Sequence, residues 1–360
     1  MALKRIVLTG GGTAGHVNPN LALVPTLQQQ GWSIFYIGSP TGIEKQLVTQ
    51  AGIPFYGISA GKLRRYWSWQ NLIDPFKVLK GIADAYWLLR QLRPNVVFSK
   101  GGFVTVPVIW SASRLGIPTV IHESDYTPGL ANRLALPFAH KICVTFPETL
   151  EYLGKHRPKA ECTGLPIRPE LLTGDLDRAL AFTQFSRHLP TLLVMGGSTG
   201  AYAINRAIRQ LLPKLTTDFQ VIHLCGQGNL APELADLPNY RQYEYLLAEL
   251  PDIFALADIV VSRAGANAIF ELLALRKPHI LIPLPTKASR GDQILNAQSF
   301  ASKGYSILIL EEELSDRTLL TAIYQLEQNR HQYVTKMQTN VIFPENTIMR
   351  LSEILNSFLG

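Results

Sequence analysis

Short runs of apolar residues alternate with helical patterns along the whole chain, and this alternation constrains the fold more than any other feature. The segments between the runs, such as 20–32 and 203–215, have the apolar spacing of helices. Strand followed by helix, repeated, predicts parallel doubly wound α/β sheets, whose ligand sites lie at the carboxyl ends of the strands. Nine runs are interpreted as strands: 5–10, 33–38, 95–101, 118–123, 141–146, 191–197, 220–226, 258–265 and 279–284.

The two halves of the chain carry related glycine-rich segments, LTGGGTAGHVNPN at 8–20 and LVMGGSTGAYAIN at 193–205. At one constant offset, Gly11, Gly12, Gly15 and Asn20 match Gly196, Gly197, Gly200 and Asn205, and Thr13 matches Ser198. A chain of 360 residues suits two domains, so we expect two Rossmann-like domains in tandem. We place them at 1–162 and 163–344, joined by the Gly- and Pro-containing segment 161–180. A last helix at about 345–360 is expected to pack back on the first domain.

The first glycine segment satisfies the G-x-G-x-x-G pattern with Gly10, Gly12 and Gly15. A dinucleotide site also needs an acid at the end of the second strand, but YIGSPTG contains none before Glu44. A glycine turn that opens a helix binds phosphate through backbone N–H groups and the helix dipole. We therefore predict phosphate binding and disfavour a dehydrogenase; the structural alternative is that these glycines only allow tight turns.

Further polar segments follow predicted strands. They are HESDYTPGLANR at 122–133, SKGGFVTVP at 99–107, SRAGANAIFEL at 262–272 and SRGDQILNA at 289–297. The structural alternatives are that His122 and Glu123 brace neighbouring loops and that Glu271 is simply solvated. Asp175 and Asp177 form a D-x-D pair, but no strand precedes it, so we expect no metal there.

The net charge is +7, and part of the excess lies between Lys62 and Arg93. That stretch also holds Tyr66, Trp67, Trp69, Phe76, Tyr86 and Trp87. Basic charge mixed with aromatic rings suggests RNA or an anionic membrane surface, whereas the alternative is a solvated helix face above core aromatics. The three cysteines are scattered and fit a reducing compartment. Neither a signal peptide nor a membrane-spanning apolar run is apparent.

Taken together, these motifs resemble the MurG family of N-acetylglucosaminyltransferases, in its Gram-positive-like branch. The residues that carry the resemblance are GGGTAGHVNPNLAL, YIGSPTGIEKQLV, FSKGGFVTVP, IHESDYTPGLANR, GLPIRPEL, VMGGSTGAYAIN, YEY, DIVVSRAGANAIFEL and SRGDQILNA, in order. The resemblance implies the glycosyltransferase-B fold, with two Rossmann-like domains facing across a cleft. It implies inverting transfer of GlcNAc from UDP-GlcNAc to the C4 hydroxyl of MurNAc in lipid I, giving lipid II. This reaction of peptidoglycan synthesis takes place at the cytoplasmic face of the cell membrane, without a cofactor or a metal.

The resemblance also implies residue roles. In the donor half, Ser198 and its loop meet the diphosphate, Arg168 adds charge, Leu246 meets uracil, Glu271 takes the ribose diol and Gln293 the sugar hydroxyls. Thr13 and Gly15 face the donor sugar, and Gly12, Thr13, His16, Gly101 and Gly102 lie on the acceptor side. Asp125 is placed among the UDP-GlcNAc contacts, at the position where many members have the asparagine of HEQN. SRGDQILNA and KLRRYWSWQNL are further departures from the common pattern.

For the mechanism, a single displacement needs a base to take the proton of the C4 hydroxyl. A neutral imidazole suits that role near pH 7, so His16 is the first candidate. The alternative is that His16 only hydrogen-bonds a phosphate or sugar, with Glu123 or Asp125 as the base. We expect Arg64, Arg65, Trp67 and Trp69 to meet the anionic inner-leaflet surface, and we expect no nucleic acid partner.

Two rival enzymes share the implied fold: a UDP-sugar transferase acting on another lipid, and a UDP-GlcNAc 2-epimerase. The epimerase needs neither an acceptor domain nor a membrane patch. A non-catalytic RNA-binding module would explain the basic aromatic stretch but not two glycine loops.

Overall fold

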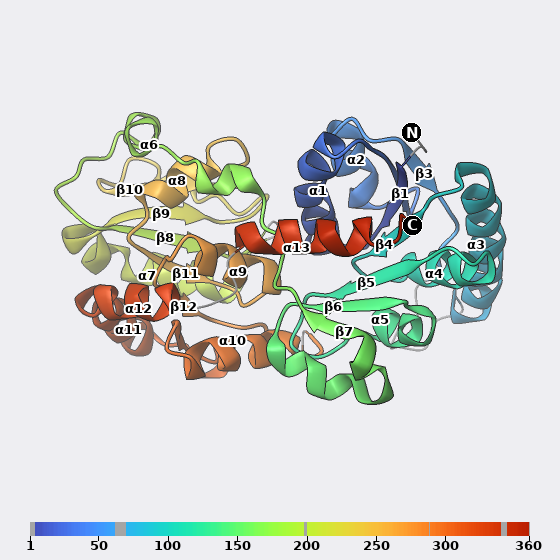
Figure 1. Cartoon of the computed structure of the whole chain (residues 1–360). Coiled ribbons are helices and arrows are strands. Elements are labelled where there is room, and N and C mark those ends of the chain that lie inside the picture. The colour runs from blue at the N-terminus through green and yellow to red at the C-terminus, as the bar shows by residue number, and fades with distance from the viewer. Residues whose placement is uncertain (1–3, 62–69, 198–199, 288, 340–343, 360) are drawn as a thin grey trace. The chain divides into compact units, whose positions relative to one another are not determined.

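The computed structural model describes residues 4–61, 70–197, 200–287, 289–339 and 344–359 (Figure 1). By their internal contacts the residues form two units. The first comprises Met1–Arg168 with Ile342–Gly360, and the second comprises Pro169–Val341. The division falls within the segment 161–180.

The first unit is built on a parallel sheet in the order β3-β2-β1-β4-β5-β6-β7. Its strands are β1 (Lys4–Thr9), β2 (Trp32–Gly38), β3 (Phe55–Gly57), β4 (Val96–Ser99), β5 (Thr119–Glu123), β6 (Lys141–Val144) and β7 (Ala160–Cys162). Its helices are α1 (Ala14–Gln29), α2 (Ile43–Gln50), α3 (Gln70–Leu92), α4 (Thr105–Arg114), α5 (Leu130–Ala135) and α13 (Pro344–Asn356), with 3-10 segments at Leu136–Phe138 and Pro147–Lys159. The chain starts at β1, runs to one edge and returns to β4 beside β1. The carboxyl ends of β1 and β4 are therefore the switch point, where open α/β sheets bind ligands.

Both faces of this sheet are buried, which explains why its central strands are continuous apolar runs. Ile6 and Leu8 of β1 belong to a core cluster shared with α1, α2 and α13. Val7 between them belongs to a second cluster, shared with α3, α4 and α5. Alternate side chains of one strand thus serve the two faces.

The C-terminal helix α13 packs on the first unit. Leu351 and Leu355 are fully buried in the same cluster as Leu27 of α1. The indole Nε1 of Trp32 donates to Oδ1 of Asn356 at 3.2 Å. The C-terminal helix α13 and the N-terminal strand β1 therefore belong to the same hydrophobic core.

The second unit has a parallel sheet in the order β10-β9-β8-β11-β12-β13. Its strands are β8 (Thr191–Met195), β9 (Gln220–Leu224), β10 (Tyr240–Tyr243), β11 (Ile259–Ser262), β12 (His279–Leu281) and β13 (Ser306–Leu308). Its helices are α6 (Leu176–Thr183), α7 (Tyr202–Asp218), α8 (Leu250–Leu256), α9 (Ala266–Ala274), α10 (Asp292–Ser302), α11 (Asp316–Gln328) and α12 (Arg330–Gln338), with 3-10 turns at Pro169–Leu172, Pro232–Leu234 and Glu311–Glu313. From β8 the strand order runs through β9 to the edge strand β10, and the chain then returns to place β11 on the other side of β8. The carboxyl ends of β8 and β11 therefore form the second switch point.

The doubly wound α/β class is confirmed in both units. All nine runs expected to be strands form strands. The four strands that the apolar pattern did not indicate are β3, β7, β10 and β13, which are the edges of the two sheets. Each has only three or four residues. Within the described ranges, no helix combines the length and apolar character needed to cross a membrane.

Candidate active site

Two glycine turns meet at the switch point of the first unit. One links β1 to α1 and the other links β4 to α4. The amide of Gly11 donates to the carbonyl oxygen of Gly101 at 3.3 Å. A Cβ on Gly102 would lie 2.3 Å from the carbonyl oxygen of Gly11, and Gly102 has a φ of +94°. The structure therefore packs the two turns that carry Gly12, Thr13, Gly101 and Gly102 backbone against backbone, which only glycine permits.

His16 is the third residue of α1 and turns back onto the first glycine turn. Its Nδ1 lies 2.9 Å from the carbonyl oxygen of Gly11 and 3.3 Å from Oγ1 of Thr13. Because a carbonyl oxygen can only accept, Nδ1 carries the proton. In the neutral ring, Nε2 is then the basic nitrogen. The backbone of the glycine turn thus selects the tautomer that a general base acting through Nε2 requires.

Thr13 and Gly15 lie at the start of α1. Thr13 is the exposed residue immediately before the helix, and Gly15 is its half-buried second residue. The first turn of a helix offers backbone N–H groups and the positive end of its dipole, which favour an anion.

Glu44 of α2 is fully buried beside the same turn. Its Oε2 accepts from the amide of Gly12 at 3.4 Å, and its Oε1 accepts from the amide of Ser39 at 3.0 Å. This carboxylate braces the turn from inside. It does not provide the accessible acid at the end of β2 that a dinucleotide ribose requires.

The segment after β5 is organised by Glu123, which is 6% exposed. Its Oε1 accepts from the amide of Asp125 at 3.0 Å. Its Oε2 accepts from the amide of Gly129 at 2.9 Å and from Nδ2 of Asn132 at 2.8 Å. Both carboxylate oxygens are therefore engaged in holding the loop. Asp125 is half-buried, and its carbonyl oxygen accepts from Oγ1 of Thr149 at 3.3 Å.

Lys100 is a buried functional group at this sheet edge that the sequence reasoning missed. It directly follows β4, and its Nζ lies 2.6 Å from Nδ1 of His122. Burial lowers the pKa of Lys100 to about 7. The sequence did contain a sign of this residue. Lys100 stands between an apolar strand and a Gly-Gly turn, which is the carboxyl end of a central strand, where ligand sites of such sheets lie.

In the second unit, the turn 196–201 links β8 to α7, and its Ser198 lies outside the described residues. Gly200 has a φ of +78°, and a Cβ there would lie 2.1 Å from the carbonyl oxygen of Cys225. The backbone at Gly200 therefore packs tightly on the segment after β9.

The loops after β11 and β12 come together at the same sheet edge. Nδ2 of Asn296 donates to the carbonyl oxygen of Ala264 at 3.1 Å. Gln293 is the second residue of α10. Its Oε1 accepts from the amide of Leu284 at 3.1 Å, and its Nε2 faces Gly265.

Leu246 and Glu271 are half-buried at further points of the second unit. Leu246 lies in the loop after β10, and Glu271 lies on α9, which follows β11. Parallel strands place these loops along one edge of the sheet.

The asparagine shared by the two glycine segments is structural. Nδ2 of Asn20 donates to the carbonyl oxygen of Thr9 at 3.2 Å. Nδ2 of Asn205 donates to the carbonyl oxygen of Cys225 at 2.8 Å. Both asparagines are buried and tie their helix to the sheet. His16 has no counterpart in the second segment, where Ala201 stands, and this is the chemical difference between the two turns.

Arg168 and the D-x-D pair lie near the division between the units. Arg168 is half-buried and is the last residue of the first unit. Asp175 caps α6 by accepting from the amide of Arg178 at 2.8 Å. Asp177 pairs with Arg187 at 2.6 Å. Both aspartates thus have structural partners in the second unit.

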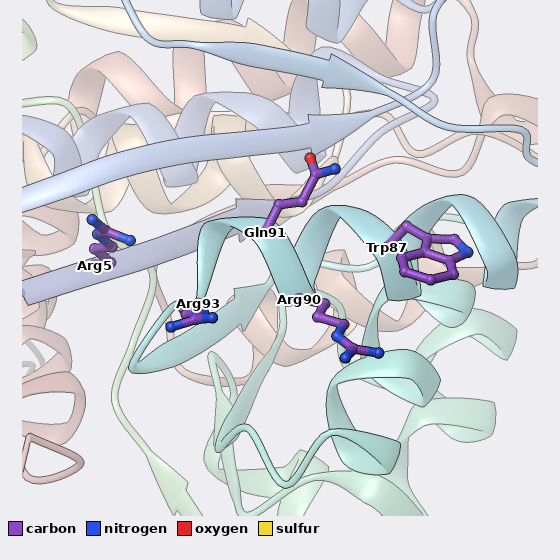
Figure 2. Close-up of a pocket in the computed structure, with 5 residues that line it drawn as sticks. All are labelled: Arg5, Trp87, Arg90, Gln91 and Arg93. Carbon is purple, nitrogen blue, oxygen red and sulfur yellow. The ribbon is translucent and has the colours of Figure 1, made fainter.

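The expected membrane residues Arg64, Arg65, Trp67 and Trp69 lie outside the described residues. The helix α3 that follows them exposes Phe76, Leu79 and Trp87 by 72%, 64% and 59%. At its C-terminal end, a shallow cavity of about 470 Å³ is lined by Arg5, Trp87, Arg90, Gln91 and Arg93 (Figure 2). Across the described part of the chain, none of these three arginines has a carboxylate partner.

Two family models match the chain: the glycosyltransferase family 28 N-terminal domain at residues 6–144 and the glycosyltransferase family 28 C-terminal domain at 191–351. A Lachnoclostridium phytofermentans protein is 59% identical over 94% of this chain and 95% of its own length. A Clostridium perfringens protein is 56% identical over 95% of both chains. Both are named UDP-N-acetylglucosamine–N-acetylmuramyl-(pentapeptide) pyrophosphoryl-undecaprenol N-acetylglucosamine transferase.

Among solved structures, Acinetobacter baumannii MurG matches with a TM-score of 0.77 and 25% identity, covering 98% of this chain and 99% of its own. A UDP-N-acetylglucosamine 2-epimerase matches with a TM-score of 0.70 at 14% identity, covering 99% of this chain and 96% of its own, which shows only a shared fold. Because both domain models match and relatives above half identity span nearly the whole chain, this protein belongs to the MurG family of N-acetylglucosaminyltransferases.

Proposed function

We propose that this enzyme transfers N-acetylglucosamine from UDP-GlcNAc to the C4 hydroxyl of MurNAc in lipid I, giving lipid II for peptidoglycan synthesis. The observation that carries this proposal is the 56–59% identity, over at least 94% of both chains, to enzymes named for that reaction. The tautomer of His16 at the glycine turns of the first unit supports it from the chemistry of the site.

The second unit is proposed to bind the donor. The turn 196–201, with Ser198, and the N-terminus of α7 suit the diphosphate, because backbone N–H groups and the helix dipole attract an anion. Glu271 is proposed to hold the ribose diol, Leu246 to meet uracil and Gln293 to bind the sugar hydroxyls. Arg168 adds positive charge for the departing diphosphate.

The first unit is proposed to bind the acceptor and to supply the base. His16 Nε2 takes the proton of the C4 hydroxyl as its oxygen attacks C1 of the donor sugar. The bond from C1 to the diphosphate oxygen breaks, and UDP leaves with the electron pair. One displacement inverts C1. The turns with Gly12, Thr13, Gly15, Gly101 and Gly102 shape this half of the site.

Glu123 is proposed to act as a positioning residue, because both of its oxygens hold the loop 124–132. Asp125 at the start of that loop remains the candidate for a contact to the donor sugar. Buried Glu123 thus holds in place the loop that carries the half-buried side chain of Asp125.

We infer that the enzyme works as a peripheral protein on the anionic cytoplasmic face of the cell membrane, where lipid I presents its head group. Exposed Phe76, Leu79 and Trp87 suit the interface, and the arginine-lined cavity of α3 attracts lipid phosphates. The preceding Arg64, Arg65, Trp67 and Trp69 extend the same composition in sequence.

The decisive experiment incubates the enzyme with radiolabelled UDP-GlcNAc and a short-chain lipid I analogue, and analyses the linkage of the product. We expect a β-linked disaccharide on the lipid diphosphate. Transfer only to a different lipid would favour another UDP-sugar transferase. Conversion of UDP-GlcNAc to its 2-epimer without any acceptor would identify an epimerase, and either result would refute the proposal.

A further inference from the structure

Lys100 is a lysine in the core of the first unit with no role in the reaction described above. Its side chain is 1% exposed. Its Nζ lies 2.6 Å from Nδ1 of His122 and 2.7 Å from Oγ of Ser124. Within the described ranges, no carboxylate lies at ion-pair distance from Lys100. Burying an amine without an ion pair costs folding free energy, so the two hydrogen bonds must compensate for the lost contact with water.

His122 is one of the two hydrogen-bond partners of Lys100. It is fully buried, and its Nε2 lies 2.8 Å from the carbonyl oxygen of Gly164. Because a carbonyl can only accept, Nε2 carries the proton and Nδ1 offers its lone pair to Lys100. Burial, and next the charge of Lys100, hold the pKa of His122 well below its usual range, so the ring is neutral.

The hydrogen bonds of this pair join three segments at the carboxyl edge of the sheet. Lys100 leads into the Gly101–Gly102 turn after β4. Ser124 begins the loop after β5, whose anchor Glu123 follows His122 directly. Gly164 belongs to the buried segment after β7. Two side chains therefore tie together loops that are distant in sequence.

We propose that Lys100 is a positioning residue of the acceptor half: it donates to His122 and Ser124, and thereby fixes the Gly101–Gly102 turn against the loop after β5. This inference rests on the proposed function of the first unit. The geometry suits the role because the two acceptors lie at 2.6 and 2.7 Å from one nitrogen.

The two hydrogen bonds of Lys100 do not depend on whether its amine is protonated. Burial lowers its pKa to about 7, and the opposite charges of Glu123 and Asp125 partly offset that effect. Burial raises the pKa of the neighbouring Cys143 thiol to about 12, so that group is neutral in the same pH range. These groups and His122 are the titratable groups that face it, from β5, the loop after it, and β6. Since an amine and an ammonium each carry at least two N–H groups, both hydrogen bonds persist through the titration.

The test replaces Lys100 by methionine, which keeps the chain length and removes the donors. We expect kcat/KM for the lipid I analogue to fall about 10- to 100-fold, the effect of losing hydrogen bonds to a charged donor. The KM for UDP-GlcNAc should change much less, because Asp125 is the one donor contact proposed on this loop. Lys214→Met, at an exposed site on α7 of the second unit, is the matched control and should leave both parameters unchanged. Equal effects of Lys100→Met on both substrates, or none on either, would overturn the proposal.

A second measurement uses no substrate, so it tests the role of Lys100 even if the proposed function is wrong. In histidine-selective ¹⁵N spectra of the full chain, assigned with His122→Gln, the wild type should show His122 protonated at Nε2 with a hydrogen-bonded Nδ1. Lys100→Met should lose the Nδ1 hydrogen bond and shift the Nδ1 resonance of His122, while the Gly164 carbonyl keeps the proton on Nε2. An unchanged His122 signal would refute the role of Lys100 even in an active enzyme.

Ser124→Ala provides an independent variant if Lys100→Met does not fold. It removes one acceptor and keeps the contact between Lys100 and His122. We expect a smaller loss in kcat/KM for the acceptor, in the same direction, with the hydrogen bond at Nδ1 of His122 retained. A larger KM for UDP-GlcNAc and a normal acceptor KM would contradict the assignment to the acceptor half.

Discussion

The imidazole Nδ1 of His16 lies 2.9 Å from the carbonyl oxygen of Gly11, five residues earlier in the chain. The glycine turn therefore does more than leave room for a ligand. Its backbone holds the proton on Nδ1 and leaves Nε2 as the basic nitrogen, so loop geometry and acid–base chemistry are joined in one segment.

His16→Ala should lower kcat by about 10²- to 10⁴-fold, the usual contribution of a positioned general base. The KM for UDP-GlcNAc should remain nearly unchanged, because the donor is proposed to bind the second unit. Steady-state kinetics with a short-chain lipid I analogue measures both. His188→Ala, at an exposed site, is the control. Near-normal turnover of His16→Ala would eliminate His16 as the base.

The pH–rate profile separates His16 from Glu123. If His16 is the base, its removal abolishes the acidic limb of the kcat profile, since no imidazole remains to be protonated. Glu123→Gln should keep that limb while lowering activity and stability, because it disrupts the hydrogen bonds from Gly129 and Asn132. The reverse pattern would make Glu123 the base.

Gly102→Ala should be more destabilising than Gly116→Ala, although both glycines have positive φ angles of +94° and +67°. A Cβ at 116 meets nothing within 4 Å, so that variant reports only the backbone cost of about 1–2 kcal/mol. A Cβ at 102 would also strike the carbonyl oxygen of Gly11 at 2.3 Å. We expect a further loss of about 1–3 kcal/mol and a higher acceptor KM. Urea unfolding and kinetics measure the two effects, and equal losses would show that the turns do not need this close approach.

Removal of the ion pair between Arg350 and Glu161 should weaken the attachment of α13 to the first unit in a pH-dependent way. Hydrogen bonds from Arg350, and then from Lys141, hold the pKa of Glu161 at about 2, below its usual 4.5. A depressed carboxyl pKa contributes stability above pH 4.5 that is lost as the pH falls toward 2.

Because Arg350 is half exposed, solvent screening limits the effect of Arg350→Met to about 0.5–1 kcal/mol at pH 7. The difference from wild type should disappear near pH 2. Thermal unfolding at the two pH values tests this, with the exposed Arg317→Met as control. A difference that persists at the lower pH would assign the effect to packing instead of charge.

Reversal of charge at the C-terminal end of α3 should weaken binding to anionic vesicles. Each basic residue near an anionic surface contributes about 1 kcal/mol, so Arg90→Glu with Arg93→Glu should lower the partition coefficient by at least about tenfold. Co-sedimentation at low ionic strength measures it, and salt should weaken wild-type binding. Arg317→Glu on the second unit should bind as the wild type does. Equal binding of the double variant would exclude the arginine-lined cavity from the membrane surface.

The sequence predicted the central strands of both sheets because they are buried on two faces. Runs such as Ile6–Val7–Leu8 supply each face in turn, and that requirement is visible as an unbroken apolar pattern. The edge strands β3, β7, β10 and β13 are short and have a neighbour on one side only, so no comparable run marks them. These four segments are strands because they hydrogen-bond to a neighbouring strand, and that pairing exists only in the folded sheet.

The glycine turns, His16 and Glu123 were likewise recognisable in the sequence, since each follows a predicted strand. Their partners were not. Oγ1 of Thr13 and the Gly11 carbonyl are local to His16. Glu123, however, hydrogen-bonds Asn132 of α5, and Lys100 hydrogen-bonds His122 of the neighbouring strand β5 and Ser124 of the loop that follows it.

Local periodicity and residue type thus determined by themselves that this chain forms two doubly wound units with polar loops at the strand ends. Only the tertiary structure decided which hydrogen-bond partners those polar side chains have and how deeply each is buried. The physical reason is that hydrogen-bond partners, burial and the resulting pKa values arise where segments distant in the chain are brought together, as Lys100 and His122 are.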